Sequence, residues 1–364
     1  MFLLLSGCTV YAQTITTITG NGIIGRTGDG GPAATAQVFF PYGITTDKAG
    51  NLYIADDYNY CIRKINTRGI ITTIAGGAVT GYRGDNDMAT AAEFSEITGV
   101  ACDATGNIYV ADHGNSRIRK ISNTGIATTI AGNGSDALSG DGGRAVYACL
   151  GAGPNGIILD KEENIIFSDN SNIRKINKAG IITRLAGNGN PIYSGDGGPA
   201  TAAGMVKPKG MALDAEGNLY VADYDDNRVR KITRAGIITP FAGNGYASDP
   251  GLGAYYGDGG PATAAELSGP ADVAVDGAGN VYISDYNNLC VRKVNPSGII
   301  STFAGTAVTG YSGDGGPATA AKFLSTAGLT IDAAGNLYIC DPVNNRVRKV
   351  EKACVPIQGS IIKK

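Results

Sequence analysis

The sequence predicts an all-β protein, a six-bladed β-propeller with four antiparallel strands in each blade. The first observation is a repeat: a Gly-Asp turn recurs at intervals of 55 to 62 residues. Its six aspartates are Asp29, Asp85, Asp141, Asp196, Asp258 and Asp314. The second observation is that every unit carries four short β-type runs. Repeats of this length indicate stacked or radial architectures, and four short strands per repeat describe a propeller blade.

The first unit shows these elements in order, as residues 42–47, 51–56, 61–65 and 69–76. The runs are rich in Ile, Val, Tyr and Thr and are bounded by Gly, Asn and Asp, which favours strands. The turn "DKAGN" between the first two runs predicts a hairpin, because Gly and Asn accept positive φ. The helix-like piece "PATAAEL", with Pro in its first turn, is too short for a helical solenoid.

The two ends of the chain predict how the ring closes. The sixth unit stops after its third run, residues 345–350, and lacks the fourth. A run of that type, "TITTITG", lies instead at residues 14–20. We therefore expect this N-terminal strand to complete the last blade as its outermost strand, which leaves no blade open at its edge.

The repeated pattern "P-x-G-(I/V)-x-x-D-x-x-G-N-(L/I)-Y-(I/V)-A-D-x-x-N-x-R-(I/V)-R-K-I" resembles the NHL repeat, and it covers residues 14–350. The resemblance implies a six-bladed propeller. It implies less about activity, because NHL-type propellers serve as RNA-binding, protein-binding, sensor and lyase domains. The third unit matches least well, since "DKEENIIFSD" lacks the turn glycine.

The chain divides into residues 1–12, a shortened export signal, residues 13–350, a single propeller, and residues 351–364, a C-terminal tail. The apolar start followed by "VYA" predicts cleavage after Ala12. The alternative is the lipobox-like "LSGC", which would make Cys8 a lipidated N-terminus. Either signal predicts a secreted, periplasmic or cell-surface protein, and no run reaches transmembrane length. We expect a monomer.

Charge and cysteine content exclude several classes of partner. The net charge is −2, with 30 basic and 32 acidic residues. Nucleic-acid binding demands an excess of positive charge, so it is not expected. The seven cysteines form no C-x-x-C or zinc spacing and are interpreted as small buried hydrophobes, with Cys340–Cys354 as the one pairing to test.

The small number of residues suited to catalysis disfavours an enzymatic function. The chain has one histidine, His113, too few for the zinc site of the related peptide-amidating lyases, and it has no G-x-S-x-G nucleophile elbow. The repeated charges have a structural interpretation. The Asp that ends each second strand and the Arg-Lys pair of the third, such as Asp223 with Arg230 and Lys231, are expected to form a polar brace.

Positions that differ among the units are the candidate site. Loops on one face of a propeller carry the slot before the repeated Gly and the slot after the strand-end Asp. The first slot reads Tyr42, Thr98, Asn155, Lys209, Ala271 and Ala327, and the second Asp57, His113, Asn170, Tyr224, Tyr286 and Pro342. Unit five places Asp272 in the Gly slot, and its longer connector adds Tyr255 and Tyr256. We predict that these residues bind a protein, peptide or glycan without a cofactor; neutral drift on exposed loops is the alternative.

A second hypothesis is a metal-dependent lactonase or related hydrolase. Gluconolactonase-type propellers hold a divalent cation on the axis, and calcium near Asp272, Asn155 and Asp57 would polarise a substrate carbonyl and activate water. The substitution of Asp for Gly at position 272 favours this hypothesis. The neighbouring Lys209 argues against it, because a fixed positive charge opposes cation binding.

Overall fold

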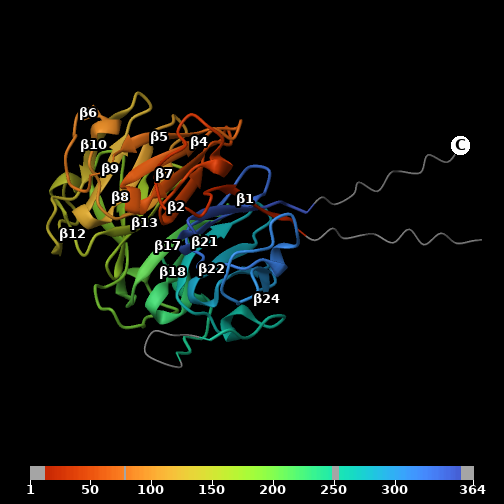
Figure 1. Ribbon diagram of the computed structural model, residues 1–364. Coiled ribbons are helices and arrows are strands. Elements are labelled where there is room, and N and C mark those ends of the chain that lie inside the picture. Colours follow the sequence, from red (N-terminus) through yellow and green to blue (C-terminus); the bar gives the residue numbers. More distant parts are fainter. Residues whose placement is uncertain (1–12, 78, 248–253, 354–364) are drawn as a thin grey trace, which may run out of the picture.

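The computed structural model describes residues 13–77, 79–247 and 254–353. Within them, four-stranded antiparallel sheets are arranged in chain order around a central axis (Figure 1), as six blades. Blade one contains β2 (Pro41–Thr46), β3 (Leu52–Asp56), β4 (Cys61–Ile65) and β5 (Ile71–Gly76). Blade two contains β7 (Ile97–Cys102), β8 (Ile108–Asp112), β9 (Arg117–Ile121), β10 (Ile126–Ala131) and an added edge strand β6 (Asp87–Met88).

The remaining blades follow the same order. Blade three contains β13 (Pro154–Leu159), β14 (Ile165–Asp169), β15 (Asn172–Ile176) and β16 (Ile182–Ala186). Blade four contains β17 (Pro208–Leu213), β18 (Leu219–Asp223), β19 (Arg228–Ile232) and β20 (Ile238–Ala242). Blade five contains β21 (Pro270–Val275), β22 (Val281–Asp285), β23 (Cys290–Val294) and β24 (Ile300–Ala304). Blade six contains β25 (Leu329–Ile331), β26 (Leu337–Asp341), β27 (Arg346–Val350) and β1 (Ile15–Thr19).

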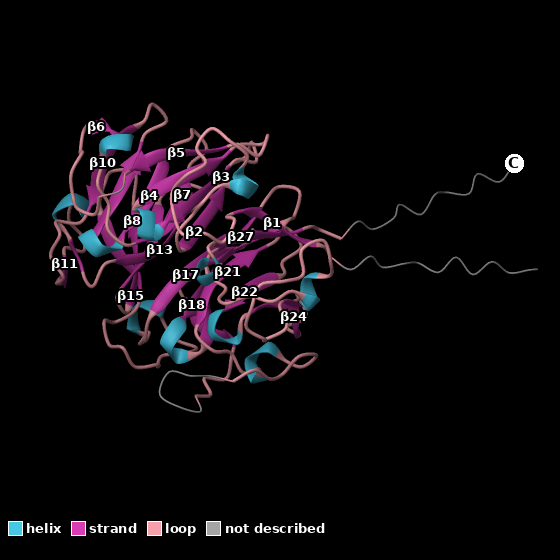
Figure 2. Cartoon of the chain, in the orientation of Figure 1, coloured by secondary structure: helices cyan, strands magenta, loops and turns pink. Residues whose placement is uncertain are grey.

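Short helical turns connect these strands, and the described residues contain no longer helix (Figure 2). One 3₁₀ turn precedes each inner strand: η1 (Ala33–Thr35), η3 (Ala89–Ala91), η5 (Ala145–Tyr147), η6 (Ala200–Ala202), η8 (Ala262–Ala264) and η10 (Ala318–Ala320). The proline expected inside this turn is the extended residue before it, as at Pro32. Other 3₁₀ turns follow the second strand: η2 (Asp57–Asn59), η4 (His113–Asn115), η7 (Tyr224–Asp226), η9 (Tyr286–Asn288) and η11 (Pro342–Asn344). A small ladder of β11 (Leu138–Ser139) with β12 (Cys149–Leu150) completes the connectors.

The predicted closure is confirmed. Strand β1 pairs antiparallel with β27, with Ile15 opposite Val350 and Thr19 opposite Val347. Figure 1 shows the red N-terminal strand beside the blue strands of the last blade. Ile15 is fully buried in the cluster that packs blade six against blade five. The N-terminal strand therefore supplies both the missing ladder and part of the core.

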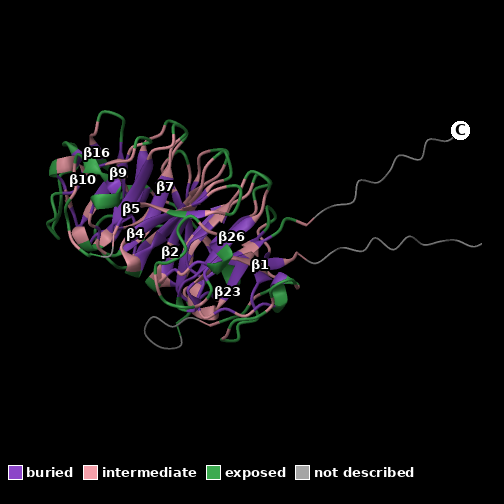
Figure 3. Ribbon diagram, turned by 45° about the horizontal axis from the view of Figure 1, so that its top comes forward, coloured by how far each residue is buried: buried purple, intermediate pink, exposed green. Residues whose placement is uncertain are grey.

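The core lies between neighbouring blades rather than in one central mass. Six hydrophobic clusters each join the faces of two adjacent blades. Figure 3 shows the strands buried and the connecting loops exposed. Because each blade packs on both sides, the second strand of each blade is buried along its whole length. This leaves the inner edge of each sheet to face the central axis.

A buried arginine braces every blade. Arg119 on β9 is fully buried and lies 3.4 Å from Asp112 and 2.9 Å from Asp85, the Gly-Asp turn aspartate of its unit. Its five equivalents, also 0–1% exposed, are Arg63, Arg174, Arg230, Arg292 and Arg348. The expectation that the lysine shares this brace is wrong. Lys231 instead lies 3.9 Å from Asp214 in the hairpin turn, since successive side chains on a strand point to opposite faces.

Blade three keeps its hairpin without the turn glycine, because Glu163 adopts a left-handed conformation with φ of 61°. Of the described cysteines, Cys61, Cys290 and Cys340 are buried, as the sequence predicts, whereas Cys102 and Cys149 are only partly buried, so the prediction is wrong for these two. The proposed partner of Cys340, Cys354, lies outside the described residues, as do the signal segment and Cys8. The described part of the chain contains no helix long and apolar enough to cross a membrane.

Candidate functional site

A ring of glycines, Gly43, Gly99, Gly156, Gly210 and Gly328, lines the central cavity. Gly156 has no positive φ, yet a Cβ on it would lie 2.4 Å from the Lys209 carbonyl oxygen. A Cβ on Gly43 would likewise meet Gly99 Cα at 2.9 Å. The repeated glycine is therefore required because inner strands of neighbouring blades approach closely, not because of its backbone freedom.

Asp272 occupies the glycine slot of blade five. Its Oδ1 accepts the Val273 N–H and its Oδ2 accepts the Leu329 N–H of blade six, both at 2.8 Å. The carboxylate also lies where a side chain on Gly210 would be, so it contacts blade four as well. Burial raises the pKa of Asp272 to about 7, with the two N–H groups opposing the shift. The side chain thus ties three inner strands together at the axis.

Lys209 lies at the mouth of this cavity, directly before Gly210. Its Nζ donates to the Tyr42 hydroxyl at 3.2 Å and lies 3.4 Å from the centre of the Tyr224 ring. Tyr42 belongs to blade one, three blades away in a ring of six, so the lysine reaches across the axis. Burial, with a smaller contribution from the neighbouring Lys207, lowers the pKa of Lys209 to about 8.

Aromatic rings extend the mouth over blades one and five. Phe40 stacks on Tyr42 with centroids 6.2 Å apart and on Tyr58 with centroids 4.7 Å apart. Tyr224 packs edge-on against Tyr286 at 6.1 Å. We call Tyr42, Lys209, Tyr224 and Tyr286 the mouth cluster. Burial raises the pKa of each of its three tyrosines, so these hydroxyls stay protonated at neutral pH.

The residues after the strand-end aspartates reach to the next blade. Asp57 is 6% exposed and accepts the backbone N–H of Ile97, while its Oδ1 has no partner among the described residues. Burial raises its pKa to about 7. His113 Nδ1 lies 3.2 Å from the Pro154 carbonyl oxygen, and its Nε2 lies 3.8 Å from Glu96. Asp57 and His113 therefore contribute to contacts between blades.

The structure does not bring all predicted residues together. Thr98, Asn155, Ala271 and Asp272 line the same cavity of about 350 Å³ as Tyr42 and Lys209. Asn170 instead takes a left-handed turn conformation with φ of 54°. The remaining slot residues Ala327 and Pro342 are buried.

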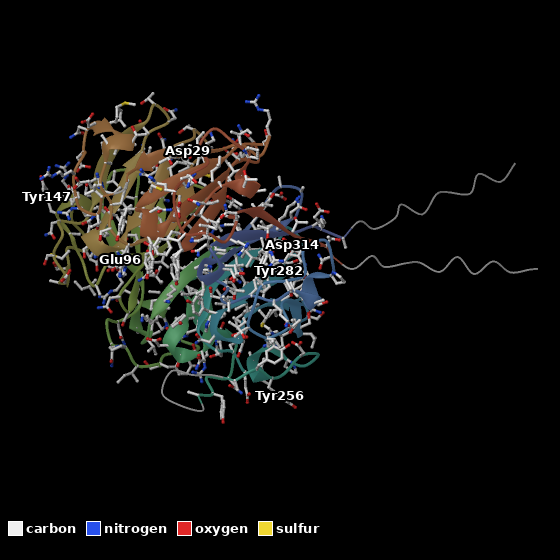
Figure 4. The ribbon with its side chains drawn as sticks, viewed as in Figure 1. Asp29, Glu96, Tyr147, Tyr256, Tyr282 and Asp314 are labelled. Atoms are coloured by element: carbon white, nitrogen blue, oxygen red, sulfur yellow. The ribbon has the colours of Figure 1, made fainter. Side chains whose placement is uncertain are left out.

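The two connector tyrosines lie away from the mouth. Tyr255 packs over Arg292 at 4.8 Å, as Tyr82, Tyr193 and Tyr311 pack over the brace arginines of other blades. Its hydroxyl lies 2.5 Å from Thr302 Oγ1. Tyr256 is 71% exposed at the outer edge of the molecule (Figure 4). Both border a separate surface pocket of about 450 Å³.

Sequence reasoning missed the aromatic extension through Phe40 and Tyr58. The doubled phenylalanine at 39 and 40 departs from the other connectors and was the available signal.

For a metal, the described residues contain no group of three or more His, Cys, Asp or Glu side chains that could hold an ion. The three residues of the lactonase hypothesis come from blades five, three and one; Asp272 and Asn155 line the central cavity together with Lys209, and Asp57 is not among its lining residues.

Comparison with known families identifies the class of protein. The model of the teneurin NHL domain matches residues 21–81, 130–194, 189–249 and 239–309, which is more than half of the chain. The NHL repeat matches residues 94–121. The chain therefore belongs to the teneurin NHL domain family and is an NHL-repeat β-propeller.

Individual relatives are similar over most of this chain. Human teneurin-4 is 29% identical over 350 residues, which cover 87% of this chain and 12% of that protein. Teneurin-3 of Danio rerio is 29% identical over 389 residues, covering 95% of this chain and 13% of that protein. This chain thus corresponds to about an eighth of the length of these relatives.

Solved structures show the same fold. A structural genomics protein of unknown function from Bacteroides thetaiotaomicron has a TM-score of 0.66 at 21% identity, over 93% of this chain and 76% of that one. An auxiliary nutrient binding protein from the same organism has a TM-score of 0.65 at 15% identity, with the same coverage. A gluconolactonase from Xanthomonas campestris has a TM-score of 0.57 at 15% identity, over 96% and 93%.

Proposed function

We propose that this propeller is a binding module that recognises a protein, peptide or glycan at the mouth of its central cavity. The contact of Lys209 with Tyr42 and Tyr224 carries the proposal. Side chains from blades far apart in the sequence converge there, at positions that differ from unit to unit. Tyrosine offers broad contact area and a hydroxyl at low entropic cost, which suits polar ligands with apolar faces.

The charges at the mouth favour a ligand rich in hydroxyl and amide groups. Lys209 can donate to an incoming oxygen in place of the Tyr42 hydroxyl. The Asp57 carboxyl, whose Oδ1 has no partner among the described residues and whose pKa burial raises to about 7, is partly protonated at neutral pH. Such a group can both donate and accept hydrogen bonds, as a sugar or a peptide backbone requires.

The comparisons support a binding role at the level of the fold. One solved propeller of similar fold is described as an auxiliary nutrient binding protein. We place the protein outside the cytoplasm, secreted or at the cell surface, on the apolar start of the chain. Fractionation of cells that express the full chain tests this placement.

Glycan and peptide arrays with the purified full chain test the binding role. We expect a Lys209→Met variant to lose at least tenfold in affinity for any ligand found, because the ammonium donor is removed. Lys48→Met, which changes an exposed lysine in a hairpin turn at the other end of the strands, should bind normally. Circular dichroism confirms folding of both variants. Hydrolysis of a lactone without array binding would overturn the proposal and favour the metal-dependent hydrolase.

A further inference from the structure

A tyrosine from the second strand closes five of the six interfaces between blades. These interface tyrosines are Tyr53, Tyr109, Tyr220, Tyr282 and Tyr338, each 4–9% exposed. Each hydroxyl donates to Oδ2 of the hairpin-turn aspartate of its own blade, at 3.0–3.3 Å. Each ring packs against apolar residues of the next blade, as Tyr282 does beside Leu329 and Leu337 of blade six.

A lysine on the third strand covers most of these rings. Its Nζ lies 5.2–5.7 Å from the ring centre in four blades, through Lys64, Lys120, Lys231 and Lys293. Three features therefore hold four of the five phenols: a carboxylate that accepts the hydrogen bond of the hydroxyl, a cation over the ring face and an apolar wall from the next blade; Tyr338 has the carboxylate and the wall. A cation within about 6 Å of an aromatic centroid is attracted to the ring face.

Blade three keeps the carboxylate and the cation but lacks the ring. Ile166 takes the tyrosine position at its interface with blade four. Lys175 is therefore free to bond Asp160 Oδ2 directly, at 2.7 Å, at the oxygen that accepts the tyrosine hydroxyl elsewhere. The acceptor and the cation are both present without the group that they hold in other blades.

A cavity of about 640 Å³ opens at this interface. Its apolar wall is formed by Leu159, Ile166, Leu185, Leu213, Leu219 and Ile232. Asp160 and Lys175 line it as well, and it lies at the hairpin ends of the strands, away from the mouth cluster. Lys161 Nζ donates to the Ala215 carbonyl and so joins the two hairpins that border the cavity. The volume falls in the range of sites that bind small molecules, about 300–1,000 Å³.

We propose that this cavity binds a ligand bearing a phenol ring with an alkyl substituent at the para position. The ring would pack on Ile166 and Leu213, and its hydroxyl would donate to Asp160 Oδ2. Lys175 would move from the carboxylate to the ring face, as its equivalents lie in other blades. The ligand thus restores the arrangement that a tyrosine provides at five interfaces, just as an apolar cavity in a protein core accepts a matching ring.

Titration of the full chain with 4-methylphenol, followed by calorimetry and thermal shift, tests the proposal. We expect one saturable site in the natural protein and none in Ile166→Tyr, because the new side chain occupies the position proposed for the phenol ring. Tyr282→Ile should create a second site at the interface of blades five and six, and Tyr220→Ile serves if that variant does not fold. 4-Methylanisole, which cannot donate to Asp160, should bind about tenfold more weakly.

A second ligand distinguishes whether the bound ring belongs to a tyrosyl side chain or to a free phenol. If N-acetyltyrosinamide binds as tightly as 4-methylphenol, the site accepts a tyrosyl side chain; if it binds more weakly, the site accepts a free phenol. Saturable binding of neither compound to the natural protein would overturn the proposal. Binding that is unchanged in a folded Ile166→Tyr variant would overturn it equally.

Discussion

Two layers of this propeller use basic side chains in opposite ways. In the brace, an arginine is fully buried in every blade and bonded to the turn aspartate of its own unit. At the mouth, Lys209 occurs once, and its partners are phenols from blade one and from its own blade. Repetition therefore marks the side chains that hold a blade together. A single occurrence marks a position that is not needed for the blade.

The two layers also differ in what removal of the charge would leave behind. Loss of Arg119 leaves two aspartates without their cation, one of them fully buried. Such uncompensated burial is strongly destabilising. Loss of the Lys209 charge leaves only neutral tyrosines, which can pack against an apolar replacement. The same kind of substitution should thus have very different consequences in the two layers.

The largest loss of stability is expected on deletion of the N-terminal strand, because blade six, formed by the C-terminal part of the chain, depends on it for its outermost strand. Deleting residues 13–20 removes β1, exposes the edge of β27 and removes the buried Ile15. We expect a loss of about 5 kcal/mol or more, since Ile15 alone contributes about 1.5–3 kcal/mol and the ladder bonds add to it. Thermal melts measure this. Removal of the residues after Val355 is the control, and equal melting temperatures would contradict closure by β1.

The second prediction tests the brace itself. Arg119→Met should cost about 3–5 kcal/mol, because Asp112 is left buried without its ion pair. Chemical denaturation at neutral pH gives the value. Arg83→Met changes an arginine whose side chain is 83% exposed and should alter stability by less than about 1 kcal/mol. A cost for Arg119→Met as small as that of Arg83→Met would mean that the brace is not a stabilising layer.

The blade count, the hairpins and the closing strand could be predicted from the sequence because each depends on a pattern that recurs. Because the turn aspartate and the strand-end aspartate recur in all six units, they identify the corresponding positions of a blade even in a unit whose sequence has diverged. Blade three illustrates this, since Glu163 replaces the turn glycine and the hairpin still forms.

The contacts at the mouth could not be predicted in the same way. Lys209 and Tyr42 are 167 residues apart, and repeats give the slot of each residue but not how far its side chain reaches. The second partner of each brace arginine, the Gly-Asp turn aspartate, was also missed, because the repeated Gly-Asp pair was interpreted only as a turn signal. Ile166 was visible in the sequence as an exception, but its consequence depends on the volume that a tyrosine fills elsewhere.

A third prediction concerns the glycine ring that lines the central cavity. Gly156→Ala should cost about 1–3 kcal/mol, because its Cβ would overlap the Lys209 carbonyl oxygen at 2.4 Å. Gly277→Ala is the matched control, since that glycine has no positive φ and no atom within 4 Å of a Cβ. It should be neutral or slightly stabilising. Equal melting temperatures for the two variants would show that the inner strands can separate without cost.

The smallest effect is expected at the mouth and depends on pH. Lys209→Met should change stability at pH 7 by less than about 1 kcal/mol. The variant loses the cation–π contact, but it also avoids the cost of burying a charged ammonium, and the two effects offset each other. Lys48→Met is the control for loss of a lysine. The sign of the pH dependence follows from the pKa of Lys209, lowered by burial from 10.5 to about 8.

Between pH 8 and 10.5 the unfolded chain keeps the Lys209 proton that the folded chain has released. Stability that depends on this group therefore rises with pH across that window. Melting temperatures of the natural protein should rise relative to those of Lys209→Met from pH 8 to 10.5, and other titrating groups cancel in the difference. A difference that stays flat would mean that Lys209 is solvated like a surface lysine and that the mouth does not hold it as the structure shows.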